Sequence, residues 1–566
     1  MIPLMCHRSC LFSKRVPFAA YHSFISKSIP MPTSKIYAFF DTKKMTYRNL
    51  LLTLLASVAL ALPWYFEQST VIVFFSLLPF LFVAQQLSSR WALWRYTFLF
   101  IFLWLLLISS WLPFSGFDPV HYISLNLFMA LIHATILWLG IIIARSNNVT
   151  SYIKDILFIG AWLAFEYIQK SWVFSDSITI LGASLASIPE MIQWYEFTGV
   201  LGGSAWILLI NCLAFRLLQN YQKRKLVTLA GIIISPVIVS LSLFAFYSHL
   251  SLPDLSVAAI NPKVYSNTSD LDKVATKITQ KNLEITKELL NNCPDIILWQ
   301  EGSIGGNHFE NALNENDESL REIKHLASIC NNTEILAGLK IYNKLTGQAK
   351  DRRLKRNAYN CVLFIDNDEN TENYPFKIKQ KLVPFGEYFP YKNLLMNSIP
   401  AVIQWIPELE KRMFYNYSSD PDKGSIIFNK GQHKLGTLIC YEALFAECTE
   451  QLVKNGAETI FVLSDESLYP NRVGAFQLGS QITLRAIEAR RFIVKSCNYG
   501  SVRFTHLNGK MTASQDFDQE GGIYNKVGLY DKITFYMTHR NAVDLSYLFL
   551  GLLGLILCFT SRFKQF

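Results

Sequence analysis

The sequence lacks the short motifs that usually bind metals or nucleotides. It contains no Cys-x-x-Cys pair, no His-Glu-x-x-His and no glycine-rich phosphate loop. The net charge is +10, yet the basic residues form no single stripe of the kind that nucleic-acid-binding surfaces carry. We therefore expect no metal, no cofactor and no nucleic-acid partner.

Apolar residues, in contrast, are abundant and unevenly spread. Of the 566 residues 51% are hydrophobic, and they concentrate in residues 48–250 and 542–560. A buried core helix would explain one long apolar run but not eight. Eight runs are each long enough to cross about 30 Å of hydrocarbon, and they lie near 49–66, 70–87, 94–113, 122–144, 153–169, 198–218, 227–249 and 542–561. We predict an α-helical membrane domain with about eight spans.

The charges between these runs predict the orientation. Lys and Arg precede the first span, flank the second, fourth and sixth loops, and follow the last span. The loops near 67–69 and 114–121 carry none, and the loop at 170–197 has only Lys170. Because basic loops stay in the cytoplasm, both termini are expected to be cytoplasmic. Seven crossings then place residues 251–541 on the outer face.

Four segments follow from this division. Residues 1–44 form a basic extension without an apolar run of spanning length, which we expect to be disordered or untranslated, with Met45 as the alternative start. Residues 45–250 hold seven spans, residues 251–541 a globular domain, and residues 542–566 the eighth span and a tail.

The outer segment alternates strand-like and helix-like stretches, which is typical of an α/β layered fold. Helical periodicity covers 271–290, 320–330 and 481–491. Short apolar runs predict strands at 255–260, 295–299, 334–339, 360–365, 435–439 and 459–463. In such sheets the carboxyl ends of the strands usually carry the chemistry.

Three reactive side chains follow predicted strands or lie close to them. Cys440 follows LGTLI, Glu301 follows DIILWQ, and Lys379 lies in KIKQKLVPFGEYFP. Taken singly, each has an ordinary explanation as a buried thiol, a helix cap or a solvated lysine. Together, a carboxylate base, a thiol nucleophile and a cation for the oxyanion suffice for acyl transfer through a thioester.

The segment 391–415 is unusually apolar for a loop. An exposed patch of this kind marks a membrane or lipid contact, and a helical hairpin packed on the domain is the alternative. Its large apolar residues are Leu394, Leu395, Met396, Ile399, Val402, Ile403, Trp405, Ile406 and Phe414. We take Leu395, Trp405, Ile406 and Phe414 as the lipid-contact residues.

Several longer stretches match one known family. The order Glu, Lys, Cys resembles the nitrilase superfamily, whose domain is an αββα sandwich. Combined with the membrane runs, the chain resembles the bacterial apolipoprotein N-acyltransferases over roughly residues 45–561. The most specific matches are LVPFGEYFP at 382–390, ICYE at 439–442, LRAIEARR at 484–491, KSCNYG at 495–500 and QWYEFTGVLGGSAWILLIN at 193–211.

The resemblance implies roles for individual residues. Glu301 is the expected general base, Cys440 the nucleophile and Lys379 the oxyanion lysine, chosen over Lys377 and Lys381 because it lies eight residues before Glu387. The supporting residues implied in the same way are Glu387, Tyr441, Glu442 and Asn360. The chain departs from the family at Gln300, where proline is common, at Ser464 to Leu468, and at Leu478, where histidine is usual.

The implied reaction takes an acyl chain from a phospholipid, typically phosphatidylethanolamine, onto Cys440. The chain then passes to the α-amine of a diacylated apolipoprotein. The implied location is the bacterial inner membrane, with the catalytic domain in the periplasm. Two alternatives stay open: a membrane-tethered nitrilase-like amidase or hydrolase, and a non-catalytic protein that has kept the fold.

Six cysteines lie in the outer segment, a compartment that permits disulfides. If Cys440 is free, five remain, so at least one more thiol is unpaired within the domain. The sequence does not assign the pairs.

Overall fold

A computed structural model describes residues 42–115, 119–146, 149–265, 271–309, 313, 317–330, 332–344, 356–366, 373–398, 417–467 and 471–563. The chain forms two compact units, residues 1–51 and 52–566. The contacts given below all lie within the second unit.

The predicted spans are helical. They correspond to α2 (Thr42–Ala61), the 3-10 helix η3 (Glu67–Phe74) with α3 (Leu78–Gln86), α4 (Arg90–Ile108), α5 (Pro119–Ser146), α6 (Ser151–Ser171), α7 (Tyr195–Gln219), α8 (Lys223–Ser248) and α17 (Phe535–Phe563). Within the described part of the chain, seven helical segments are long and apolar enough to cross a membrane. The exception is α6, the fifth predicted span, which is helical but carries Lys154, Asp155 and Glu166.

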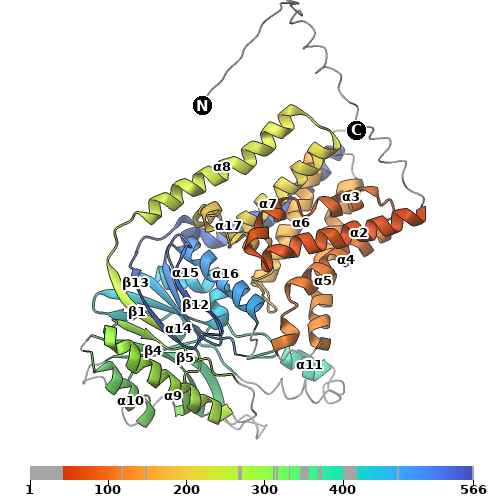
Figure 1. Cartoon of the computed structure of the whole chain (residues 1–566). Helices are drawn as coiled ribbons and strands as arrows, with labels where there is room; N and C mark the ends of the chain where they lie inside the picture. Colours follow the sequence, from red (N-terminus) through yellow and green to blue (C-terminus); the bar gives the residue numbers. More distant parts are fainter. Residues whose placement is uncertain are drawn as a thin grey trace, which may run out of the picture. The chain divides into compact units, whose positions relative to one another are not determined.

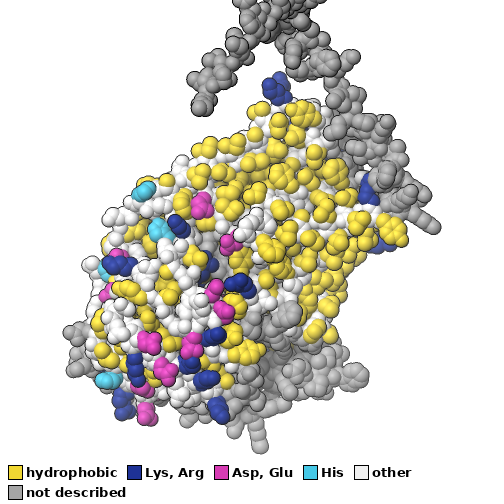
Figure 2. Space-filling view, viewed as in Figure 1, with side chains coloured by type: hydrophobic (Ala, Val, Ile, Leu, Met, Phe, Trp, Pro, Cys, Tyr) yellow, Lys and Arg dark blue, Asp and Glu magenta, His cyan; other side chains and the backbone are white. Residues whose placement is uncertain are grey.

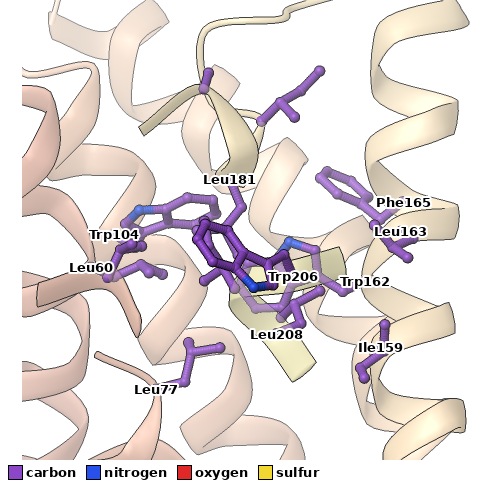
Figure 3. Packing of buried hydrophobic residues seen from close by; sticks show 14 of the residues in the cluster. Leu60, Leu77, Trp104, Ile159, Trp162, Leu163, Phe165, Leu181, Trp206 and Leu208 are labelled. Atoms are coloured by element: carbon purple, nitrogen blue, oxygen red, sulfur yellow. The ribbon is translucent and has the colours of Figure 1, made fainter. Parts of the chain in front are cut away.

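Aromatic and aliphatic side chains fill the space between these helices. Trp104 of α4 and Trp162 of α6 are fully buried, with ring centroids 5.7 Å apart. Figure 3 shows these two rings beside Trp206 of α7 and Leu181. Leu181 comes from η5 (Leu181–Leu185), a 3-10 turn in the long loop between α6 and α7. That loop is therefore part of the helical core rather than a surface connection.

The surface divides by composition. Figure 2 shows hydrophobic side chains covering the region of the membrane helices, whereas Lys, Arg, Asp and Glu gather over the part built from strands. On α8 the exposed apolar residues include Ile234, Ile238, Val239 and Leu241. An exposed apolar surface of this extent marks contact with lipid or protein, as expected for spanning helices.

Residues 254–528 form two mixed β-sheets. The first has the order β13-β1-β2-β4-β5-β6, with β3 also paired to β4, and the second has the order β12-β11-β10-β9-β8-β7. The first contains β1 (Asp254–Asn261), β2 (Ile296–Leu298), β3 (Ile304–Phe309), β4 (Glu334–Lys344), β5 (Arg356–Ile365), β6 (Phe376–Ile378) and β13 (Gly521–Gly528). The second contains β7 (Phe428–Lys430), β8 (His433–Ile439), β9 (Thr459–Asp465), β10 (Phe492–Asn498), β11 (Val502–Thr505) and β12 (Met511–Gln515).

The layers follow the order helix, sheet, sheet, helix (Figure 1). Between the sheets, Val257 and Leu336 from the first meet Phe461 and Val494 from the second. The outer face of the first sheet packs on α9 (Leu271–Leu289) and α10 (Glu318–Ala327). That of the second packs on α15 (Ala446–Lys454) and α16 (Arg472–Ala489). The predicted αββα sandwich is confirmed.

All six predicted strands are present, as β1, β2, β4, β5, β8 and β9. The remaining strands were not predicted, and α16 begins at Arg472 rather than near residue 481. Among the described cysteines, Cys293 and Cys330 form a disulfide, while Cys361, Cys440, Cys448 and Cys497 of the same domain are not disulfide-bonded.

Candidate active site at the carboxyl ends of the strands

Glu301, Lys379 and Cys440 each follow the carboxyl end of a strand. Glu301 lies three residues after β2, Lys379 directly follows β6, and Cys440 directly follows β8. β2 runs parallel to β4, and β6 runs in the same direction because two antiparallel pairings through β5 separate β6 from β4. The two sheets therefore bring three chain segments that are distant in sequence to one site.

Lys379 is the centre of the charge arrangement. Its Nζ lies 3.0 Å from Oε1 of Glu301 and 2.8 Å from Oε1 of Glu387, and its side chain is 1% exposed. Burial opposes the charge of Lys379, but the attraction of Glu301, Glu387 and Cys440 outweighs burial and raises the pKa of this amine well above its ordinary value. The lysine is therefore a fixed cation at neutral pH.

Asn360 of β5 links the two carboxylates. Its Nδ2 donates to Oε1 of Glu301 at 2.5 Å and to Oε1 of Glu387 at 3.2 Å. The other oxygen of Glu387 accepts from the backbone N–H of Val383 at 2.8 Å. Glu387 and Asn360 thus hold the amine of Lys379 and the carboxylate of the predicted base at fixed positions.

Cys440 occupies a sharp turn. Its φ of +48° is unusual for a residue other than glycine, and the chain passes there from β8 into the 3-10 helix η9 (Cys440–Leu444). Burial raises the pKa of the Cys440 thiol to about 12, and the charge of Glu301 adds to this effect, whereas Lys379 and a hydrogen bond with Ser464 oppose it. The candidate nucleophile is therefore a thiol at rest, and it would require a base to react.

Glu442 fixes the turn that carries Cys440. Its fully buried carboxylate accepts from the backbone N–H of Ile439 at 2.7 Å and from the backbone N–H of Gln380 at 2.6 Å. It also forms an ion pair with Lys377. One carboxylate therefore positions the residue before the thiol and the residue after Lys379.

Tyr441 points to the loop between α6 and α7. Its hydroxyl donates to the carbonyl of Ser175, and the hydroxyl of Tyr388 donates to the carbonyl of Val173 at 2.8 Å. These bonds join the candidate site to the loop that leaves α6. Tyr441 therefore connects the turn after Cys440 to this loop.

The predicted lipid-contact residues are only partly visible. Trp405, Ile406 and Phe414 lie outside the described residues, as does the side chain of Leu395 in α11 (Lys392–Ser398). The neighbouring Leu394 is 62% exposed. Nothing in the described part of the segment tests the lipid contact, which stays a prediction.

Two residues that sequence reasoning did not select also lie here. Ser464 forms a hydrogen bond with Cys440, and the backbone N–H of Asp465 donates to Oε2 of Glu301 at 3.2 Å. The sequence feature that could have identified both residues is their position at the end of a predicted strand. Among the described residues, no group of three or more His, Cys, Asp or Glu could hold a metal ion.

Family models match both domains of this chain and define the class of protein. Residues 256–531 match the family model described as carbon-nitrogen hydrolase, and residues 56–213 match the one described as apolipoprotein N-acyltransferase N-terminal domain. A solved amidase from Nesterenkonia sp. covers 52% of this chain and 95% of its own at 11% identity, and yeast Nit3 covers 52% and 95% at 13%. Their TM-scores, 0.34 and 0.33, are too low to bear on function.

Curated relatives extend over both domains. The apolipoprotein N-acyltransferase of Chlorobaculum tepidum is 24% identical over 70% of this chain and 74% of its own. Apolipoprotein N-acyltransferase 1 of Treponema denticola is 24% identical over 82% and 87%. With both domains present in this order, the chain belongs to the apolipoprotein N-acyltransferase family.

Proposed function

We propose that this protein transfers an acyl chain from a phospholipid to the N-terminal amine of a diacylated apolipoprotein, through a thioester on Cys440. The observation that carries the proposal is the position of Lys379, which lies between Glu301 and Glu387 and interacts with Cys440. The family names the overall reaction, and the phospholipid donor, with phosphatidylethanolamine as our expectation, is part of the proposal.

In the first step Glu301 accepts the proton of the Cys440 thiol. The sulfur attacks the ester carbonyl of the donor, and the ammonium of Lys379 stabilises the oxyanion that forms. When the carbonyl re-forms, the ester C–O bond breaks and Glu301 returns its proton to the departing lysophospholipid oxygen. The acyl chain is then held as a thioester.

In the second step the acceptor amine attacks the thioester carbonyl. The N–C bond forms, the C–S bond breaks, and the electron pair returns to the sulfur of Cys440. Glu301 is placed to move the amine proton to that sulfur, so the enzyme ends as it began. A neutral thiol at rest is consistent with this cycle, because each thiolate forms only when a carbonyl is in place.

We further propose that the catalytic domain faces the periplasm and that both termini are cytoplasmic. The Cys293–Cys330 disulfide supports an oxidising compartment. The basic loops that flank alternate helices support the same orientation. The lipid-facing role of the segment 391–415 belongs to this proposal as well.

The test uses purified full-length protein with acyl-labelled phosphatidylethanolamine and a synthetic diacylated lipopeptide. Label appearing on the amine of the lipopeptide supports the proposal. Release of free fatty acid instead, with no labelled lipopeptide, identifies a hydrolase. A protein that consumes no donor would be a non-catalytic relative. Cys440→Ala is the matched negative control, since it removes the sulfur and leaves a small side chain.

A further inference from the structure

Asp465 contacts the candidate base and directly follows Ser464, which forms a hydrogen bond with the candidate nucleophile. It ends β9, whose register with β8 pairs Leu463 with Ile439, so Cys440 lies beside Ser464, the neighbour of Asp465. The backbone N–H of Asp465 donates to Oε2 of Glu301. Asp465 therefore contacts the base directly and is one residue from the partner of the thiol.

Hydrogen bonds from two residues hold the carboxylate of Asp465. Its Oδ1 accepts from the backbone N–H of Ser467 at 3.0 Å and from Nδ2 of Asn498 at 3.1 Å, and the side chain of Ser467 also forms a hydrogen bond with this carboxylate. Among the described residues, no Lys, Arg or His forms an ion pair with it. The residue is half-buried.

The other carboxylates around the site have cations of their own. Glu301 and Glu387 share Lys379, and Glu442 pairs with Lys377. Glu466, the next residue in the chain, pairs with Lys495 inside the domain. Asp465 therefore differs from its neighbours in lacking a cation within the described part of the site.

The electrostatic environment is consistent with a missing cation. The pKa of the Asp465 carboxyl is raised to about 6, first by burial and also by the charge of Glu301, against hydrogen bonds from Ser467 and Asn498. At neutral pH this group is mostly ionised but poorly compensated. A cation brought by the substrate would lower its energy and would itself be bound.

We infer that Asp465 binds the ammonium group of the acceptor and takes its first proton. This inference rests on the proposed function, because it assigns a role only in the second step. An ammonium has no lone pair and cannot attack a thioester. Transfer of one proton from the ammonium nitrogen to the carboxylate of Asp465 leaves a neutral amine, which then attacks, and the carboxylic acid later releases that proton to water.

Phosphatidylethanolamine also carries an alkylammonium group, so the donor head group is the other possible source of this cation. The two sources predict effects on different steps. Binding of the acceptor affects only transfer from the thioester. Binding of the head group affects only formation of the thioester, and only from donors with an ammonium.

The experiment compares wild type with Asp465→Asn, which keeps an oxygen for Ser467 and Asn498 but removes the charge. Three single-turnover rates are measured by intact-protein mass spectrometry. The first is acylation of Cys440 by phosphatidylethanolamine and, separately, by phosphatidylglycerol. The second is transfer to the diacylated lipopeptide, as a function of its concentration. The third is cleavage of the thioester by hydroxylamine, which is neutral at neutral pH.

We expect D465N to slow transfer to the lipopeptide by about ten-fold to a hundred-fold, with a raised KM for the lipopeptide. Acylation from both donors and cleavage by hydroxylamine should stay within about two-fold of wild type. Asp465→Glu should recover part of the transfer rate. Asp516→Asn is the matched control, because the side chain of Asp516 is exposed and forms an ion pair with Arg472 on the surface.

Equal losses with lipopeptide and hydroxylamine would overturn the inference, since they would indicate a general distortion of the site. Slower acylation by phosphatidylethanolamine alone would overturn it in favour of the donor head group. If wild type forms no thioester at all, the proposed function fails before Asp465 is tested, and the two failures are distinguished in this way.

Discussion

Glu442 and Lys377 form an ion pair whose side chains are 0% and 1% exposed. The pair joins the turn after β8 to the end of β6, because Glu442 also accepts from the backbone N–H groups of Ile439 and Gln380. It therefore couples the position of Cys440 to that of Lys379.

Removing one partner of this pair should be costly. Lys377→Met leaves the Glu442 charge buried without its cation, so we expect a loss of about 3–5 kcal/mol in stability, measured as a lower midpoint of unfolding in detergent. The control is Lys381→Met, four residues away, whose ion pair with Glu447 is partly exposed and should contribute about 1 kcal/mol or less. Equal losses in the two variants would show that burial of the first pair has no energetic consequence.

The reactivity of Cys440 should follow the charges around it. Because burial and Glu301 raise its pKa to about 12, the thiol stays protonated at neutral pH, and its alkylation by iodoacetamide should accelerate as pH rises above the ordinary thiol range. Glu301→Gln removes a negative charge and should shift this profile to lower pH. Lys379→Met removes a positive charge and should shift it to higher pH.

Both of these variants should nevertheless lose acyl transfer, Lys379→Met by about a hundred-fold or more. The opposite shifts in thiol reactivity, measured by mass spectrometry of the peptide that carries Cys440, separate electrostatic effects from unfolding. An alkylation rate in wild type that levels off near neutral pH would contradict a protonated Cys440, because it would indicate a thiolate at rest.

The disulfide should contribute to the stability of the catalytic domain. Cys293 and Cys330 are 37 residues apart, and a closed loop of this length gives about 4 kcal/mol in the chain-entropy model. Replacing both with serine should lower the unfolding midpoint, whereas reductant should lower it in wild type and not in the variant. Cys361→Ser is the control for exchanging sulfur for oxygen at a buried cysteine outside the disulfide, and reductant should still lower its midpoint as in wild type. An unchanged midpoint on reduction would show that the bond does not form in the membrane-derived protein.

The sequence predicted the layered fold and two strand ends of the site, because alternation and short apolar runs are local signals. It could not separate Lys377, Lys379 and Lys381 without the family resemblance, since all three share one parity along the chain. Strand β6 ends at Ile378. The turn that follows places each of the three lysines beside a different carboxylate. Which of the three lysines lies near Cys440 depends on the position of β8, which belongs to the other sheet.

Asp465 was missed for a related reason. The predicted strand ended at residue 463, whereas β9 continues to Asp465 and is paired on both sides by β8 and β10. Pairing between strands that are far apart in the sequence decides which residue lies at the edge of the site. Amino-acid composition does not reveal this pairing. The charges of α6 illustrate the opposite case, since Lys154, Asp155 and Glu166 were visible in the sequence and distinguish this helix from the other predicted spans.

In the proposed mechanism, Cys440 carries an acyl chain during the reaction. The most direct measurement is mass spectrometry of the purified protein after incubation with phosphatidylethanolamine and without acceptor. We predict the added mass of one acyl group on the peptide that contains Cys440, its loss on addition of the diacylated lipopeptide, and its absence in Cys440→Ala. An acyl group on another residue, or continued acyl transfer by Cys440→Ala, would show that the reaction does not proceed through a thioester on Cys440.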